Sequence, residues 1–528
     1  MFKKLRKFFT SRIVWVSILL FLEIALIFVF AYSLVGSFMS LFNLTDWQVW
    51  VIMIVLLYVI SFLVVVYIVN SHAKPAYKIT WLVVVAVLPL LGSFFYLLFG
   101  NKKITYRQKR KIKPIYQMLT STQIEKSIAE KIKSENIDAY QMASYITKAS
   151  GADLYQNSIV SYYPSGEKVF PEMIKELKKA KKFIFIEYFI IAPGLFWDSI
   201  LEVLKEKVKE GVDVRLIYDD VGSAGYVPLR YEKKLNAMGI KTVAFHKFKP
   251  LLDVKINNRD HRKIMVIDGN VGFSGGINLA DEYINKLKRF GYWKDNAIKI
   301  EGSAVDGLTT LFLTQWLSIA EADFSQANFF NENYMRFFPT HQGIVGNGYV
   351  QPYGDLPYNE ESVGEQVYLN LIAKAKKYIY ITTPYLIIDD EIVNALSNAV
   401  KQGVDVRIVT PKIPDKKITF GITRSHYRVL LKNGVKIYEY TPGFIHMKMF
   451  VVDDIYAAVG TINLDYRSLY LHLENSTFMY RCNCINDMKN DFINIFEVSE
   501  EITYRRYKQY LAPRRFIWSV LRMFAPLL

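Results

Sequence analysis

The sequence predicts an α/β fold made of two repeated halves that follow an apolar N-terminal region. Short apolar stretches with the character of buried strands alternate with amphipathic helical stretches from about residue 115 onward. The same order of segments then recurs at an offset of roughly 190 residues. Alternation of this kind is typical of layered α/β domains. A constant offset indicates an internal duplication rather than chance similarity.

The repeat is visible in matching stretches of the two halves. AKKFIFIEYFII, from Ala180, corresponds to AKKYIYITTPYLI, from Ala375, and KEGVDVRLI, from Lys209, corresponds to KQGVDVRIV, from Lys401. Each half has the size of a domain, and a duplicated fold often places one site between its halves. We therefore divide the chain into an N-terminal membrane region at 1–112, a first half at 113–330, a second half at 331–500 and a C-terminal tail at 501–528.

Composition and charge favour a membrane-associated protein. The 528 residues are 52% hydrophobic and carry a net charge of +17. A basic chain implies an anionic partner, and high hydrophobicity makes an anionic lipid surface a better candidate than nucleic acid. The two cysteines, Cys482 and Cys484, have no second ligand pair nearby, so a zinc site is not expected.

Three apolar stretches near the N-terminus, residues 13–35, 47–69 and 79–99, are each long enough to cross a bilayer as a helix. The first is too long for a signal peptide and is interpreted as an anchor. Basic residues precede the first stretch and follow the third, at 101–113, and the positive-inside rule places both groups in the cytoplasm. Three full crossings cannot satisfy this, so we expect the third stretch, interrupted by Pro89 and Gly92, not to span.

The duplication carries a five-residue motif in each half. Both copies read His-x-Lys, four residues, Asp, six residues, Gly, two residues, Asn. The first copy consists of His261, Lys263, Asp268, Gly275 and Asn278, and the second of His446, Lys448, Asp453, Gly460 and Asn463. One His-x-Lys alone would mean little, but two matched motifs in matched repeats indicate a function.

The motif suits chemistry on a phosphate. We expect His-x-Lys to lie on a strand, so that the two side chains point to the same face. Two such sets meeting in one cleft would surround a phosphate with two imidazoles, two ammonium groups and two amides. One histidine could then attack phosphorus while the other protonates the leaving alcohol, with no metal and no cofactor. For His72, His246, His341 and His426 a packing or surface role is expected, and His472 is left undecided.

These motifs resemble the phospholipase D superfamily, and several flanking stretches resemble its bacterial cardiolipin synthase branch. Those stretches are NNRDHRK from Asn257, TPYLI from Thr383, YEYTPGFIHMK from Tyr438, LDYRS ending at Ser468, and LPLLGSFFYLLFG from Leu88. The resemblance extends from about Lys74 to the end of the chain. It implies two phospholipase D-type α/β/α halves that form a pseudo-dimer, preceded by N-terminal transmembrane helices.

The resemblance also implies a reaction and a location. His261 would attack the phosphate of one phosphatidylglycerol, and His446 would protonate the departing glycerol. The hydroxyl of a second phosphatidylglycerol would then displace the histidine and give cardiolipin. The implied partners are phosphatidylglycerol, cardiolipin and an anionic lipid surface, without nucleic acid. The implied location is the bacterial cell membrane, as a multi-pass protein with its catalytic part on the cytoplasmic face. The oligomeric state stays open.

Family analogy suggests roles for the remaining residues. An acidic residue on a following strand fixes the tautomer of each histidine in this family, and Asp295 and Glu474 occupy those positions. Asp268 and Asp453 are expected to hold the architecture more than to touch substrate. Substrate contacts are expected from Gly275, Asn278, Gly460, Thr461 and Asn463. The family usually has serine after the motif glycine. Here the second copy has Thr461, which keeps the hydroxyl, and the first has Gly276, which does not.

Other readings of the sequence remain. The same motifs would serve a phospholipase D or a phosphatidyltransferase with a different alcohol acceptor. A nuclease uses the same histidine chemistry, but the apolar N-terminus argues against it. A scaffold without catalysis is disfavoured because His, Lys and Asn are intact in both copies. The C-terminal stretch RRFIWSVLRMFAPLL, from Arg514, is a basic amphipathic tail that either lies in a membrane interface or packs on the catalytic part.

Overall fold

The computed structural model describes residues 45–100, 114–120, 122–247, 258–320, 334–357, 359 and 361–527. Contacts between residues divide the chain mainly into two compact units, one of Met1–Lys103 with Lys247–Asn257 and the other of Ile104–His246 with Asn258–Pro526. The first predicted apolar stretch, residues 13–35, lies outside the described residues. So do the basic run 101–113 and the predicted boundary at residue 330, and the four-segment division therefore stays a prediction.

The second and third apolar stretches form three helices rather than two. Helix α3 (Asp46–Asn70) contains the second stretch, and the third is divided into α4 (Pro75–Val87) and α5 (Pro89–Phe99) at Leu88. Proline at the start of α5 explains the break, because it disfavours helical backbone in the preceding residue but is accepted at a helix start. The predicted interruption at Pro89 is confirmed. Gly92 instead lies inside α5, where an added Cβ would meet the Val84 carbonyl oxygen at 2.6 Å.

Apolar and aromatic side chains hold these three helices together. Their core consists of Val64, Ile68, Tyr77, Trp81, Val85 and Tyr96. The Ser61 hydroxyl also donates to the carbonyl of Pro89 over 2.8 Å. Helix α3 exposes large apolar side chains along its length, among them Val55, Leu56, Tyr58, Phe62, Leu63 and Tyr67. Within the described part of the chain, no helix meets the combined length and hydropathy needed to cross a bilayer.

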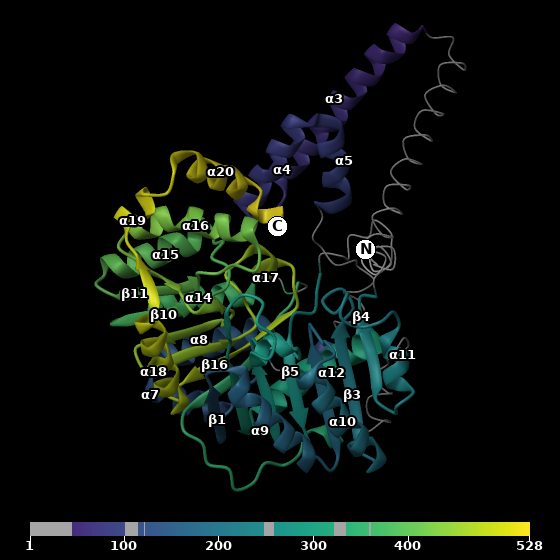
Figure 1. The fold of residues 1–528 in the computed structure, drawn as a ribbon, viewed down its shortest axis with the longest axis vertical. Helices are drawn as coiled ribbons and strands as arrows, with labels where there is room; N and C mark the ends of the chain where they lie inside the picture. Colours follow the sequence, from purple (N-terminus) through teal and green to yellow (C-terminus); the bar gives the residue numbers. More distant parts are fainter. Residues whose placement is uncertain are drawn as a thin grey trace. The chain divides into compact units, whose positions relative to one another are not determined.

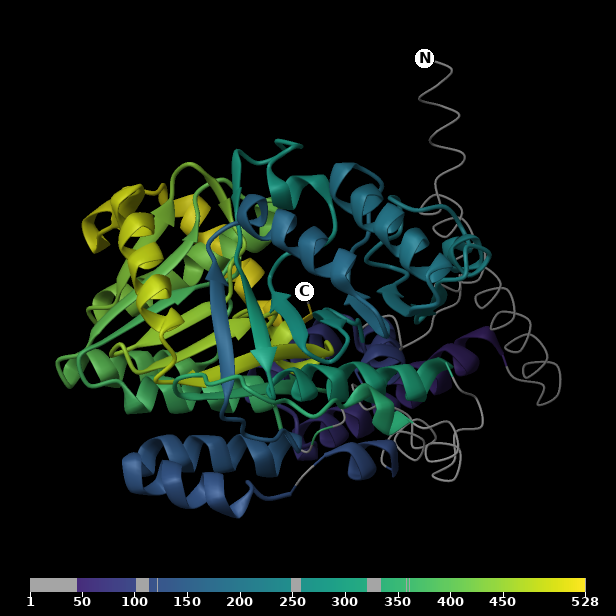
Figure 2. The same ribbon diagram turned by 90° about the horizontal axis from the view of Figure 1, so that it is seen from below.

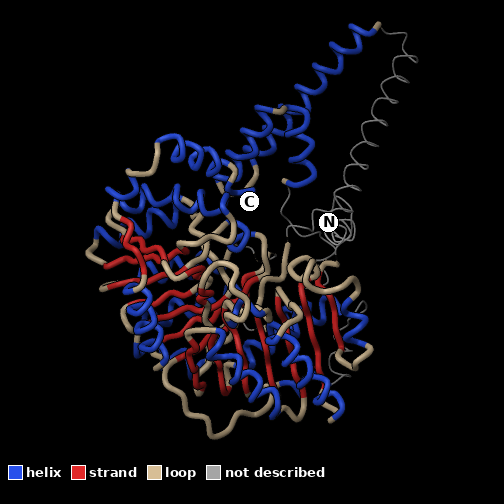
Figure 3. Tube along the Cα trace, viewed as in Figure 1, coloured by secondary structure: helices blue, strands red, loops and turns tan. Residues whose placement is uncertain are grey.

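Both halves of the duplication lie in the second unit, and each contains one mixed sheet (Figures 1 and 3). The first sheet has the strand order β1-β8-β6-β5-β2-β3-β4. The bounds are β1 Ser158–Tyr163, β2 Phe183–Tyr188, β3 Asp213–Asp219, β4 Lys241–Phe245, β5 Lys263–Ile267, β6 Val271–Gly275 and β8 Ala297–Gly302. Strands β2, β3 and β4 are parallel to one another, and the other pairings are antiparallel.

The second sheet repeats this order and adds an outer strand. Its order is β17-β12-β11-β10-β14-β15-β16-β9. The bounds are β9 Tyr349–Asp355, β10 Tyr378–Thr382, β11 Asp405–Pro411, β12 Lys436–Tyr440, β14 Met449–Val452, β15 Tyr456–Gly460, β16 Glu474–Tyr480 and β17 Ser499–Ile502. Reading from β9 to β12 gives the same succession as reading from β1 to β4. The predicted duplicated α/β fold is therefore confirmed at the level of strand topology.

Helices separate the two sheets and cover their outer faces (Figure 2). Helix α12 (Val305–Ala320) contacts β2 and β5 of the first sheet and β9 of the second, and α18 (Cys484–Glu497) contacts β12 and β14 of the second and β1 of the first. The outer helices are α9 Gly166–Lys179, α10 Leu195–Lys209 and α11 Tyr231–Asn236 in the first half, and α14 Val363–Lys374, α15 Asp390–Lys401 and α16 Lys417–Lys432 in the second. Helices α7 (Lys126–Glu135) and α8 (Ile137–Ser150) precede β1, and α8 packs on α14. One hydrophobic core runs through the layer between the sheets, which makes the halves a single body.

The backbone of each half also pairs with that of the other half. Strand β13 (Gly443–Ile445) pairs in parallel with β7 (Tyr292–Lys294) of the first half. The equivalent contact beside the first motif is an isolated parallel β-bridge between Asp260 of the first half and Leu473 of the second. The backbone N–H of His446 donates to the Lys294 carbonyl over 2.7 Å, and that of His261 donates to the Leu473 carbonyl over 2.9 Å. Each motif histidine is thus attached to the other half by the main chain.

The motif aspartates tie turns to strand starts. Asp268 accepts hydrogen bonds from the backbone N–H groups of residues 181, 182 and 183 at 2.7–2.8 Å. Asp453 accepts the equivalent three bonds from residues 376, 377 and 378 at 2.7–2.9 Å. Both aspartates have a left-handed φ of 53° at the turn that follows a strand. This geometry supports the architectural role predicted for them.

We expect Asp453→Asn to destabilise the protein without entering the chemistry. An amide keeps only one acceptor oxygen for three backbone donors, and the loss should cost about 2 kcal/mol or more. The measurement is the thermal unfolding midpoint of the detergent-purified protein. Glu202→Gln, at an exposed position on α10, is the matched control and should leave the midpoint unchanged. A loss of turnover with an unchanged midpoint would place Asp453 in the reaction instead.

Candidate active site

The two motif histidines lie at strand starts rather than within strands. His261 precedes β5, whose first residue is Lys263, and His446 lies between β13 and β14. The prediction of His-x-Lys on a strand is therefore correct only for Lys263. Each lysine nevertheless folds back on its own histidine. The ammonium of Lys263 donates to the His261 carbonyl over 2.6 Å, and that of Lys448 donates to the His446 carbonyl.

Each histidine is held by a carboxylate of the other half. His261 Nδ1 lies 2.9 Å from Glu474 Oε2, and His446 Nδ1 lies 2.7 Å from Asp295 Oδ2. All four side chains are buried. A carboxylate only accepts hydrogen bonds, so Nδ1 carries the proton and Nε2 is left as the basic nitrogen. The sequence identified both acids, and the structure shows that each acts across the interface between the halves.

Burial keeps both imidazoles neutral. Desolvation lowers the pKa of His261 to about 3 and the pKa of His446 to about 4. Burial on its own would raise the pKa of Asp295 and of Glu474, but the neighbouring histidines outweigh it, and both pKa values lie below their usual range. Two neutral imidazoles beside two carboxylates are suited to nucleophilic attack and proton transfer.

The lysines supply the positive charge of the site. Burial lowers the pKa of Lys263 to about 7 and the pKa of Lys448 to about 8, and the two ammonium groups also repel each other. Each ammonium has three donors, and the structure shows one of them bound to a histidine carbonyl. An anion between them would therefore find free donors and would relieve the repulsion. A phosphate diester matches this requirement.

The two motif asparagines differ in their partners. Asn278 Oδ1 accepts from the backbone N–H of Ile190 over 3.1 Å, and its amide nitrogen donates to the Tyr283 hydroxyl over 2.6 Å. Asn463 Oδ1 is buried and has no hydrogen-bond partner among the described residues. The Asn463 Oδ1 atom can therefore accept a hydrogen bond from a hydroxyl of the substrate, whereas Asn278 orders the loop after β2. That both bind substrate stays a prediction.

The position after each motif glycine differs in a way that affects the carboxylates. Thr461 donates its hydroxyl to Glu474 Oε2, and Ser468 donates to Glu474 Oε1 over 2.5 Å. At Gly276 an added Cβ would lie 2.1 Å from Asp295 Oδ1. Asp295 takes a backbone donor instead, the N–H of Asn296 at 2.9 Å. The missing hydroxyl of the first copy is therefore replaced by a main-chain hydrogen bond. Thr461 supports Glu474, and its predicted substrate contact stays a prediction.

The motif glycines allow neighbouring strands to approach closely. A Cβ at Gly275 would meet the Asn296 carbonyl oxygen at 2.4 Å, and one at Gly460 would meet the Asn475 carbonyl oxygen at 2.3 Å. These contacts explain why the motif has glycine at this point. Contact of either glycine with substrate stays a prediction.

His472, left undecided from the sequence, lies in the site. Its Nδ1 is 3.5 Å from Glu474 Oε1, and its ring centre is 5.7 Å from that of His261. The equivalent residue of the first half is Trp293, whose ring is 5.4 Å from His446. Both residues stand two positions before the carboxylate, which is the sequence signal that could have identified them.

Three of the remaining histidines have structural partners: His246 with the Asn258 carbonyl, His341 with Asp306 and His426 with the Ile422 carbonyl.

Aromatic residues that the sequence did not single out also line the site. Phe189 packs against His261 at 5.0 Å between ring centres, and Tyr283 packs against His446 at 5.6 Å. The Lys263 ammonium lies 5.4 Å from the ring centre of Phe189. No spacing rule connects these residues to the motif, because they reach the site from loops after β2 and β6.

Two groups of described residues could offer ligands to a metal ion. One is His261, His472 and Glu474, and the other is Glu365, Asp389 and Glu391. In the first group the carboxylate already accepts from His261, Thr461 and Ser468. In the second, the Tyr470 hydroxyl donates to Glu365 and Asp389. Cys482 and Cys484 are buried free thiols. The chemistry assigned to the residues needs no ion, and the expectation of no metal and no cofactor stays a prediction.

Comparisons with known proteins agree with this site. Residues 173–301 and 368–496 each match the family described as cardiolipin synthase, PLD-like domain, and residues 56–101 match the phospholipase D-nuclease N-terminal family. A cardiolipin synthase of Alkalihalophilus pseudofirmus is 33% identical over 94% of this chain and 98% of its own length. The chain belongs to the PLD-like cardiolipin synthase family. An uncharacterized protein of Streptococcus mutans is 45% identical over 88% of this chain and 99% of its own length.

A solved structure shows the same fold outside the close family. The crystal structure of phosphatidylserine synthase from Haemophilus influenzae superposes with a TM-score of 0.54 and covers 74% of this chain and 100% of its own. The sequence identity is 15%, so this likeness concerns the fold alone.

We expect Gly276→Ser to inactivate the site, although serine is the usual family residue there. Its Cβ would displace Asp295 from His446, and a misplacement of this size should lower kcat about 100-fold. Thr461→Ser at the equivalent position keeps the hydroxyl on Glu474 and should stay close to the activity of the wild type. The measurement is the initial rate of lipid turnover for both variants, with unfolding midpoints as a check on folding. Full activity of Gly276→Ser would contradict the packing described for Asp295.

Proposed function

We propose that this chain transfers a phosphatidyl group from one phosphatidylglycerol to the hydroxyl of another, giving cardiolipin and glycerol. The observation that carries the proposal is the pair of neutral imidazoles, each held at Nδ1 by the other half's carboxylate, beside two buried ammonium groups. Membership of the cardiolipin synthase family supports the choice of lipid substrate.

The first step would form a bond between histidine and phosphorus. Nε2 of His261 attacks phosphorus, and the bond from phosphorus to the glycerol oxygen breaks. His446, protonated on Nε2 once the anionic phosphodiester is bound, gives this proton to that oxygen, and glycerol leaves as a neutral alcohol. A phosphatidyl-histidine remains. In the second step the hydroxyl of another phosphatidylglycerol attacks phosphorus, His446 takes the hydroxyl proton, and His261 departs with its nitrogen restored.

The surroundings of the carboxylates support this division of roles. Glu474 shares its charge among His261, Thr461 and Ser468, whereas Asp295 accepts from His446 and one backbone N–H. Hydroxyl donors to Glu474 weaken its hold on a proton at His261. Burial lowers the pKa of both histidines, and binding of an anionic phosphate opposes this effect. Of the two, His446 has the carboxylate with fewer competing donors, which suits it to hold the proton of a general acid.

The charged side chains would stabilise the transition state. The non-bridging oxygens of the phosphate gain negative charge as the nucleophile adds, and preorganised donors in a buried site are worth far more than in water. Lys263 and Lys448 face the site from both halves, and Asn463 adds an amide. These donors require no reorganisation at the moment of reaction.

We assign the chain to the bacterial cell membrane, with its catalytic part on the cytoplasmic face. The apolar residues exposed along α3, the match of residues 56–101 to the phospholipase D-nuclease N-terminal family and the basic run at 101–113 support this location. The proposal keeps the prediction that stretches 13–35 and 47–69 span and that α4 and α5 form a broken pair that does not, although no helix in the described part of the chain, α3 included, itself meets the combined length and hydropathy of a span.

The product test separates this reaction from its nearest alternative. Purified protein in micelles of phosphatidylglycerol should yield cardiolipin and glycerol in equal amounts, as followed by mass spectrometry. His261→Ala and His446→Ala should each abolish the reaction, because each removes one of the two imidazoles that a carboxylate of the other half holds at Nδ1. Phosphatidic acid without cardiolipin would identify a hydrolase, and a different phosphatidyl ester on addition of another alcohol would identify a different acceptor.

The pH dependence follows from the buried lysines. The ammonium forms of Lys263 and Lys448 bind phosphate, and their pKa values of about 7 and about 8 predict that kcat/KM falls as pH rises through this range. A bound anion stabilises the ammonium, so the alkaline limb of kcat should lie at higher pH than that of kcat/KM. Initial rates between about pH 5 and pH 9.5 test this. A kcat/KM that rises between pH 7 and pH 9 would contradict it.

A further inference from the structure

The C-terminal helix presents its apolar side to the outside. In α20 (Ala512–Met523) Phe516 is 69% exposed, Ile517 is 56% exposed and Val520 is 38% exposed. At 3.6 residues per turn, these three side chains fall within an arc of about 100°. Leu511, which precedes the helix, is 74% exposed. We call Leu511, Phe516, Ile517 and Val520 the α20 face.

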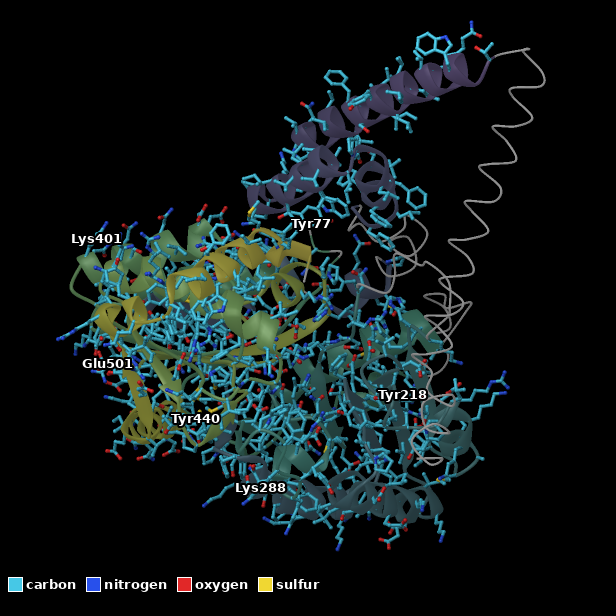
Figure 4. The ribbon with its side chains drawn as sticks, turned by 45° about the horizontal axis from the view of Figure 1, so that its top comes forward. Tyr77, Tyr218, Lys288, Lys401, Tyr440 and Glu501 are labelled. Atoms are coloured by element: carbon cyan, nitrogen blue, oxygen red, sulfur yellow. The ribbon has the colours of Figure 1, made fainter. Side chains whose placement is uncertain are left out.

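The opposite side of the helix attaches it to the catalytic part. Trp518 is 6% exposed and lies on Gly421 of α16, where an added Cβ would meet the indole at 2.6 Å. Its ring packs edge-on against Tyr510 at 5.2 Å, and the guanidinium of Arg514 lies 5.3 Å from its ring centre. Figure 4 shows α20 crossing over α16 on the side of the second half that faces the viewer. The helix is therefore a packed element of the fold, so its outer side chains hold fixed positions.

This orientation is the reverse of that of an ordinary surface helix. A helix at a protein–water boundary turns its apolar stripe to the core and its charged residues to water. Here the side with the buried Trp518 and the half-buried Arg515 and Arg522 meets the protein, and the apolar side has no cover among the described residues of the same unit. Such a side needs an apolar partner.

The charge around the face indicates which partner that is. Residues 504–528 contain six basic residues and no acidic residue. The basic residues are Arg505, Arg506 and Lys508 in and around α19 (Tyr504–Lys508), and Arg514, Arg515 and Arg522 in α20. Apolar side chains ringed by lysine and arginine are the pattern of a helix that lies in the interface of an anionic bilayer.

We propose that the α20 face docks on an anionic phospholipid surface, with Phe516, Ile517 and Val520 inserted among the headgroups. A second copy of the chain fits less well, because a twofold contact through this face would bring the six basic residues against themselves. A protein partner would have to supply carboxylates opposite all six basic residues, whereas an anionic bilayer offers negative charge at every headgroup around the inserted side chains.

The position of α20 connects the docking surface with the active site. Helix α20 packs on α16, whose Thr423 hydroxyl accepts from the backbone N–H of Leu386 over 3.2 Å. Leu386 in turn forms a β-bridge with Leu464, the residue after Asn463. Docking through α20 would therefore act on the side of the site that carries Asn463. This consequence rests on the proposed function, whereas the docking itself can be tested without turnover.

The test places a fluorophore on the face of the full-length protein. Ile517→Cys is labelled with an environment-sensitive probe, and Val345→Cys, on a loop at an apolar position that is 82% exposed, is the matched control. Native Cys482 and Cys484 are buried at 6% and 3% exposure and should not react. Both labelled proteins are reconstituted in vesicles of phosphatidylglycerol and phosphatidylcholine that carry a doxyl-labelled lipid as quencher.

We expect the probe at position 517 to shift to the blue and to be quenched by doxyl lipid at least twofold more than the probe at 345. Quenching at 517 should decrease when phosphatidylglycerol is replaced by phosphatidylcholine. Equal quenching at both positions would overturn the proposal, and equal quenching in both lipid mixtures would overturn its anionic part. A blue shift that grows with protein concentration without doxyl quenching would assign the face to a second copy. None of these readouts needs activity. A protein that docks but does not turn over lipid would therefore contradict the proposed function and leave the docking proposal intact.

Discussion

The hydrogen bond from each motif histidine to a carboxylate of the other half is the interaction on which the site depends. His261 with Glu474, and His446 with Asp295, are assembled only when the two halves pack together. Backbone pairing across the interface, through β7 with β13 and through Asp260 with Leu473, sets the positions of the histidines before any side chain acts. Neither half on its own contains a complete histidine–acid pair. Duplication therefore supplies the site as well as a larger core.

Burial turns ordinary side chains into reactive ones. Removing water from the cleft lowers the pKa of both histidines and both lysines, so the imidazoles are neutral bases and the ammonium groups are poorly solvated. Uncompensated positive charge in a buried site is costly. A bound phosphate diester relieves that cost by neutralising the ammonium groups. The free energy that the buried charges cost the folded protein therefore contributes to its affinity for the anion. The same desolvation strengthens every contact to the transition state.

The sequence predicted the duplicated α/β fold because period and repeat are local patterns, whereas the order of the strands within each sheet came only from the structure. It also identified His261, His446, Asp295 and Glu474 from motif and family. It could not show that the pairs cross, since pairings between residues 213 and 151 positions apart depend on how the two sheets pack. Nor could it find Phe189 and Tyr283, which reach the site from loops without a spacing rule. The division of the third apolar stretch at Pro89, by contrast, came directly from the local chemistry of proline.

The two halves differ at the points where the proposed reaction needs a difference. The proposed two-step transfer uses one histidine as nucleophile and the other as acid and base, although a symmetric duplication would give both the same surroundings. Thr461 and Ser468 donate to Glu474, while Gly276 leaves room for Asp295 to approach His446 with a single backbone donor. Glutamate is longer than aspartate by one methylene, and the site has a threonine beside the longer acid and a glycine beside the shorter one. The residue after each motif glycine and the acid that it faces are therefore best understood as a matched pair, which sets the proton affinity of the histidine on the opposite half.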